Sequence, residues 1–153
     1  MPRSRRARGL AVVAQLGHLH WFYGNLYEAI VRIPSRLSTP DQRLPSTLAP
    51  GSPARYHLPV APLTVGASVA AAVAGRRDPA RGWLAASAGS VLGGAVVAGY
   101  LVSRVNPKLI EADTPALTDA ERAALLRRWY RLNAVRIAAA AVAWLTAERA
   151  RRR

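Results

Sequence analysis

The 153-residue chain has no cysteine and only three histidines. Without cysteine there is no disulfide framework, no thiol nucleophile and no thiolate-bound metal centre. His18 and His20 stand two positions apart, so on a helix they point to different faces and cannot chelate one ion together. The third histidine, His57, lies at the end of the Pro-rich loop and not within a membrane helix, so no histidine on a second span could complete a haem clamp. We therefore expect no metal and no cofactor.

Acidic residues are also scarce, with 8 Asp and Glu against 22 Lys and Arg. A formal net charge of +14 would ordinarily favour nucleic-acid binding. However, charge is missing from three long stretches, which lie between Arg8 and Glu28, between Arg55 and Arg76, and between Arg81 and Arg104. About 20 helical residues cross the apolar core of a bilayer. We therefore expect a lipid bilayer, and no nucleic acid, as the partner of this chain.

The apolar stretches predict an all-α fold, a bundle of four transmembrane helices in a single domain over residues 1–153. The expected spans are residues 9–33, 57–75, 82–103 and 119–148. The Pro- and Ser-rich segment 34–59 predicts a long ordered or semi-ordered outer loop between the first two helices. The segment 106–115 is expected to break the chain after the third helix. The sequence TDAE at 118–121 has the spacing of a capping box, which predicts that the fourth helix starts outside the membrane.

Arginine clusters in the N-terminal tail, in the turn at 75–82 and in the C-terminal tail, three segments that lie on one side of a four-span protein. By the positive-inside rule we expect an inner-membrane protein with both termini in the cytoplasm. The basic N-terminus is similar to a signal peptide, but no clear small-residue cleavage site follows it, so we expect the first span to be retained. The sequence leaves open whether the chain forms a homo-oligomer.

Polar side chains gather on one face of the first and of the last predicted helix. At about 100° per residue, one face of the first helix carries His18, Trp21, Asn25 and Glu28, and Tyr23 lies on another face. Trp129, Asn133 and Arg136 form a stripe on the last helix. Ionisable residues at membrane depth usually face the bundle interior. We therefore predict that these two helices face each other and that Glu28 pairs with Arg136, either in a functional pocket or as a purely structural ion pair.

Three short motifs carry a resemblance to a known family. They are W-x-x-G-N-x-x-E at 21–28, the Asn106–Pro107 step after the third span, and W-x-x-x-N-x-x-R at 129–136. Together they resemble the anthrone oxygenase-like family of small four-helix membrane proteins, over residues 9–147. The resemblance implies oxidation of an anthrone to an anthraquinone by dioxygen without a conventional cofactor. Many members have a histidine where this chain has Asn133, so the resemblance implies that His18 replaces it as the base or that the activity is absent.

Oxidation of an anthrone needs a base, hydrogen-bond donors for an oxyanion and an apolar slot for the substrate. The catalytic candidates are His18 or Glu28 as the base, with Arg136 as the oxyanion partner. The candidates for substrate binding are Trp21, Tyr23, Asn25, Asn106, Trp129 and Asn133. Three hypotheses remain: an oxygenase-like enzyme acting on a lipophilic aromatic molecule, a non-enzymatic transporter or accessory subunit, and a purely structural bundle.

Overall fold

The computed structural model describes residues 5–152, and this part of the chain consists of helices and connecting segments without a β-strand. One isolated β-bridge joins Leu44 to Glu111, where Leu44 N–H donates to the carbonyl of Ile110 and Ala112 N–H donates to the carbonyl of Leu44. The predicted all-α fold class is confirmed.

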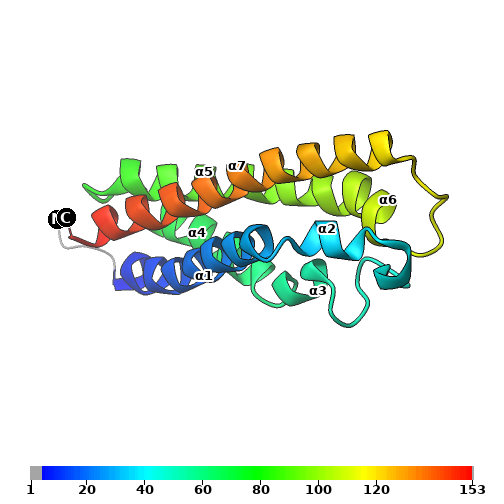
Figure 1. Cartoon of the computed structure of the whole chain (residues 1–153). Helices are drawn as coiled ribbons and strands as arrows, with labels where there is room; N and C mark the ends of the chain where they lie inside the picture. The colour runs from blue at the N-terminus through cyan, green and yellow to red at the C-terminus, as the bar shows by residue number, and fades with distance from the viewer. Residues whose placement is uncertain (1–4, 153) are drawn as a thin grey trace.

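Four long helices lie side by side along the molecule (Figure 1). They are α1 (Arg5–Ile30), α4 (Ala61–Ala74), α5 (Arg81–Tyr100) and α7 (Asp119–Arg152). The helix α1 packs against α4 and α7, and α5 packs against the same two helices, so the four form a closed ring. Both ends of the chain lie at one end of the molecule, and the short helices α2, α3 and α6 lie toward the other (Figure 1).

The long helices bury polar side chains together with apolar ones, and they expose large apolar side chains. Between them lie His18, Asn25, Ser68, Ser87 and Asn133, all buried. Their outer faces carry exposed aliphatic side chains, among them Leu16, Leu63, Val73, Leu92, Val96, Val142 and Leu145. A water-soluble domain ordinarily shows the opposite distribution, with polar side chains outside. The arrangement suits a surrounding that is itself apolar.

Among the described residues one helical stretch, Arg81–Ile110, is long and apolar enough to cross a membrane, and Ala61–Ala74 is a shorter apolar helix. By length and composition this helix is consistent with membrane association. Four transmembrane spans stay a prediction.

The segment expected to be an outer loop contains short helices instead. The first helix ends at Ile30, and Arg32 adopts a left-handed backbone conformation with φ 55° before α2 (Ile33–Leu37) begins. The 3₁₀ turn η1 (Pro40–Gln42) and α3 (Pro53–His57) follow. Each of the three has a proline in its first turn, where the missing N–H costs nothing. In α3 the side chain of Ser52 also accepts a hydrogen bond from Arg55 N–H at 3.1 Å.

The chain breaks within the expected segment 106–115, but the third long helix first continues through Asn106 to Ile110. After α5 comes the π-helical turn η2 (Leu101–Val105), followed by α6 (Asn106–Ile110). In an α-helix the ring of Pro107 would clash with the carbonyl four residues earlier. The wider π turn, closed by Asn106 N–H donating to the carbonyl of Leu101, accommodates the proline within a continuous helix. The helix ends at Ile110, and the backbone of the next residue, Glu111, is extended.

The predicted capping box is confirmed at the start of α7. Thr118 N–H donates to Glu121 Oε2 at 2.9 Å, and Glu121 N–H donates to Thr118 Oγ1 at 3.3 Å. The hydrogen bonds from the side chain and backbone of Thr118 lower the pKa of the Glu121 carboxyl below its ordinary value.

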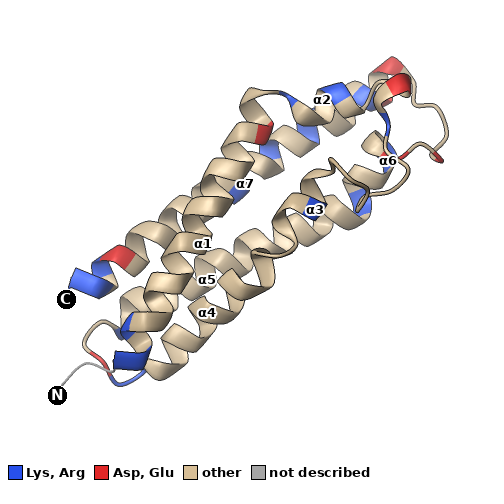
Figure 2. Cartoon of the chain, turned by 90° about the horizontal axis from the view of Figure 1, so that it is seen from below, with Lys and Arg blue, Asp and Glu red and all other residues tan. Residues whose placement is uncertain are grey.

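Lys and Arg residues lie at both ends of the molecule (Figure 2). The positive-inside rule counts only Lys and Arg within short loops. Since they are almost evenly divided between the two ends, the rule gives no clear orientation. Cytoplasmic termini stay a prediction.

Candidate functional site

The carboxylate of Glu28 lies between two basic side chains near the end of α1. Its Oε1 is 3.0 Å from His57 Nε2, and its Oε2 is 3.9 Å from an Arg136 terminal nitrogen. All three side chains are buried. The predicted proximity of Glu28 and Arg136 is therefore confirmed, although Oε2 has no hydrogen-bond partner among the described residues. A buried ion of this kind is costly without its counter-ion, which explains why the three groups gather.

Asn133 fixes the position of Arg136 and ties α7 to α1. Its side-chain oxygen accepts a hydrogen bond from Arg136 at 3.2 Å, and its side-chain N–H₂ donates to the backbone carbonyl of Asn25 at 2.9 Å. These bonds occupy Asn133 on both sides. The amide group of the Asn25 side chain is buried and has no hydrogen-bond partner within residues 5–152.

His57 was not among the residues predicted from the sequence to form the site. It reaches Glu28 because α3 lies against α1 at Gly24, where a Cβ atom would stand 2.7 Å from His57 Cε1. The His57 Nε2 faces a carboxylate, so an ionised Glu28 accepts a hydrogen bond from Nε2–H and leaves Nδ1 with its lone pair. That Nδ1 is buried and has no hydrogen-bond partner in the part of the chain that the structure describes. The only relevant signal in the sequence is the Ser52–Pro53 helix start, which places α3 but does not link it to Glu28.

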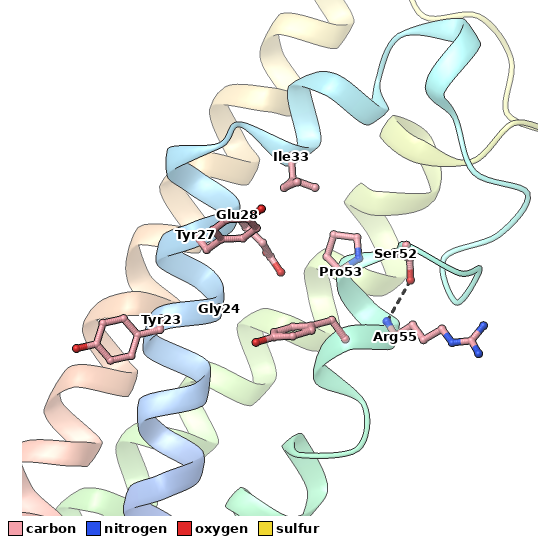
Figure 3. A pocket seen from close by; sticks show the side chains of 10 residues that line it. Tyr23, Gly24, Tyr27, Glu28, Ile33, Ser52, Pro53 and Arg55 are labelled. Atoms are coloured by element: carbon pink, nitrogen blue, oxygen red, sulfur yellow. Dashed lines mark hydrogen bonds between the residues drawn. The ribbon is translucent and has the colours of Figure 1, made fainter.

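Two cavities meet at Glu28. The inner cavity, of about 220 Å³, lies among α1, α3, α5, α6 and α7. The outer pocket, of about 680 Å³, lies between α1, the start of α2, and α3 with the residues before it. Glu28 and Pro53 line both. Figure 3 shows the carboxylate of Glu28 directed from α1 toward α3, with Ile33 and Pro53 around the same space.

The inner cavity is lined by polar and aromatic groups from several helices. They include Trp21, Glu28, His57, Asn106, Trp129 and Arg136. The indole N–H of Trp129 donates to Asn106 Oδ1 at 3.1 Å, so this pair fixes the orientation of both side chains. Asn106 takes this place because the π turn carries the helix past Pro107 instead of ending it.

Residues 53–146 match the family described as anthrone oxygenase. The chain belongs to the anthrone oxygenase family. The matched segment carries His57, Asn106, Trp129 and Arg136, and Glu28 lies before it on α1. No curated protein and no solved structure matches the chain.

Two residues that the family resemblance implicated lie away from the Glu28 cluster. His18 is fully buried, with Nε2 at 3.2 Å from Ser87 Oγ and 3.3 Å from Ser68 Oγ. Both hydroxyls donate to backbone carbonyls, so His18 Nε2–H acts as the donor to them, and His18 lines neither cavity. Tyr23 lines the outer pocket, but its ring points outward from α1 (Figure 3).

The candidate site in this member of the anthrone oxygenase family therefore centres on Glu28, His57 and Arg136. It offers a carboxylate–imidazole pair and a cation, next to an aromatic-lined space. Within residues 5–152 no group of three or more His, Asp or Glu side chains is placed to hold a metal ion. The chemistry that these side chains can perform is proton abstraction beside a positive charge.

Proposed function

We propose that this protein is a membrane-embedded oxygenase that oxidises a lipophilic, anthrone-type aromatic substrate with dioxygen and without a bound cofactor. The observation that carries the proposal is the position of Glu28, between His57 and Arg136 and at the junction of two cavities. Membership of the anthrone oxygenase family supports the reaction class.

Membrane embedding is supported by the distribution of side chains over the long helices. Exposed Leu63, Leu92, Val96 and Val142 would contact lipid, and the polar site faces the interior. In a bilayer, polar groups are stable when they pair with one another inside the bundle. A site of this kind can receive an apolar substrate from the bilayer.

The first step is removal of a proton from the activated CH₂ carbon of the anthrone. We assign the base to His57, which lines the inner cavity and whose Nδ1 has no hydrogen-bond partner among the described residues, while Nε2–H is held by Glu28. A carboxylate in this place orients the imidazole and stabilises the imidazolium that forms. The negative charge left on the substrate is delocalised onto its carbonyl oxygen, where the guanidinium of Arg136 would stabilise it.

The electron-rich anion then reacts with dioxygen. A C–O bond forms at the deprotonated carbon, and the resulting peroxide takes the proton held by His57. Loss of the second C–H proton and cleavage of the O–O bond give the new carbonyl and release water. The net change is CH₂ plus O₂ to C=O plus H₂O, so dioxygen is the only oxidant required.

A second candidate function is a non-enzymatic transporter or accessory subunit that moves protons through the same groups. The observation that favours it is the contact between His57 and His20, whose ring centroids lie 5.5 Å apart. His57 Nδ1 and His20 Nε2 are both buried without a hydrogen-bond partner among the described residues. These imidazoles extend the chain of titratable groups from Glu28 toward Tyr56, on which His20 stacks at 4.7 Å.

The test compares His57→Gln with His18→Gln in anthrone oxidation by purified protein. Removal of a general base typically lowers the rate by about 10²–10⁴-fold. We expect a loss of that order for His57→Gln, and for His18→Gln a loss of thermal stability with most of the rate retained. The reverse pattern would show that His18 is the base. Full activity in both variants would remove histidine from the mechanism.

A further inference from the structure

We infer that the outer pocket binds the body of a planar polycyclic aromatic ligand, and that this ligand enters sideways from the lipid bilayer between α1 and α3. The inference rests on the proposed function, which supplies the substrate class, but the pocket can be tested by binding alone.

Size distinguishes the two cavities. Pockets for small molecules are usually about 300–1,000 Å³. The inner cavity, of about 220 Å³, lies below this range, whereas the outer pocket, of about 680 Å³, lies well within it. A tricyclic ligand can therefore place its body in the outer pocket and pass only its reacting edge beyond Glu28, which both cavities share, into the inner cavity that His57 and Arg136 line.

The chemistry of the outer pocket suits a flat aromatic ligand. Tyr27 and Tyr56 supply aromatic surface, and Ile33 and Pro53 supply aliphatic surface. Aromatic rings gain from offset or edge-to-face contacts with other rings. The carboxylate of Glu28 is directed into this space, and the side chain of Arg55 extends away from it (Figure 3). A bound ligand would thus keep its apolar body among these side chains and direct its reacting edge past Glu28 toward His57 and Arg136, which line the inner cavity.

The pocket faces the side of the molecule, where tyrosines surround it. Tyr23 and Tyr27 are each 62% exposed and Tyr56 is 56% exposed, and all three line the pocket. Exposed tyrosines are characteristic of the interfacial zone of a bilayer. On the side toward α2 the pocket is bounded by Ile33, the first residue of that helix (Figure 3). Lateral entry is therefore more direct than entry from water.

A competing route exists on the other side of α3. The inner cavity is lined by Leu58 and Val102, which are both exposed, so a ligand could reach Glu28 between α3 and η2. The experiment must separate this route from the one between α1 and α3.

Because the natural chain has no cysteine, single-cysteine variants report on each route without background. The variants are Ile33→Cys in the outer pocket, Val102→Cys in the inner cavity, and Ile30→Cys as a control on exposed surface that lines neither cavity. Each full-length variant is reconstituted in liposomes and labelled with neutral N-ethylmaleimide or with a permanently charged methanethiosulfonate. Labelling is followed by mass spectrometry, with and without anthraquinone as the probe.

We expect anthraquinone to slow labelling of Ile33→Cys several-fold and to leave Ile30→Cys unchanged. We also compare the labelling rate of Ile33→Cys with that of Ile30→Cys. We expect the ratio of these two rates to be larger with the neutral reagent than with the charged one. The inference would be overturned if anthraquinone protected only Val102→Cys. It would also be overturned if the ratio of the Ile33→Cys to the Ile30→Cys labelling rate were larger with the charged reagent. Since labelling needs no turnover, protection at Ile33→Cys without anthrone oxidation would refute the proposed function and leave the binding site standing.

Discussion

At the scale of single residues, the proposed site depends on the negative charge of Glu28. Breaking a buried ion pair by removing one partner typically costs about 3–5 kcal/mol, because the other charge is left uncompensated. Glu28→Gln keeps the shape of the side chain and leaves Arg136 without its counter-ion. We expect the double variant Glu28→Gln/Arg136→Gln to be more stable than the single variant Glu28→Gln. Thermal unfolding in detergent measures the difference, and simply additive losses would argue against the pair.

A second residue-scale prediction concerns Gly24. A Cβ at this position would stand 2.7 Å from His57 Cε1, so Gly24→Ala should displace His57 from Glu28 and lower the oxidation rate at least tenfold. Gly89→Ala is the matched control, because a Cβ there meets nothing within 4 Å. Replacing a helical glycine in open space stabilises by about 0.5–1 kcal/mol, so this variant should keep its activity and unfold at a higher temperature. Equal activity in both variants would contradict the assigned position of His57.

The sequence predicts Glu28 and Arg136 as residues of the site, but it does not predict His57. The first two could be found because unpaired charges are costly at membrane depth and because helical spacing places each on a polar face. His57 lies in a segment with many prolines and no apolar periodicity, and only the packing of α3 against Gly24 brings it to Glu28. His18 is buried, as its place on the polar helix face predicts. Helical spacing does not predict that Ser68 and Ser87 hold its imidazole away from the cavities.

At the scale of elements, the long apolar stretches predict the four long helices. The short helices have too few residues to show the helical repeat of apolar side chains. The helices α2 and α3 contain five residues each, and their signal is local, a proline in the first turn. The continuation through Pro107 was missed for a different reason. A proline normally ends or bends a helix, and the π turn that accommodates it is a rare solution.

The capping box of α7 gives a prediction about pH. Thr118 lowers the pKa of the Glu121 carboxyl in the folded protein. The interaction therefore stabilises the folded state at pH values above the pKa that Glu121 has in the unfolded chain. This stabilisation is lost as the pH falls through the pKa of Glu121 in the folded protein. Thr118→Ala should therefore lower the melting temperature most at neutral pH and least in acid. Thr118→Ser keeps the hydroxyl and should resemble the natural protein. A loss that is independent of pH would show that Glu121 takes no part.

At the scale of the whole molecule, the exposed aliphatic side chains of the long helices and the polar side chains buried between them predict an integral membrane protein. After an alkaline carbonate wash the chain should stay in the membrane fraction, and it should dissolve only in detergent, because stripping it from lipid would expose side chains such as Leu92 and Val96 to water. Release by carbonate would contradict membrane embedding.

The proposed oxygenase activity depends on the Glu28 site of this member of the anthrone oxygenase family. The most direct measurement is the uptake of dioxygen by the purified natural protein, reconstituted in lipid and supplied with an anthrone, against protein-free liposomes. We expect uptake well above the spontaneous rate, one dioxygen consumed per anthraquinone formed, and a loss of at least tenfold in Glu28→Gln. Uptake at the spontaneous rate by a folded natural protein would contradict the account for this class of substrate.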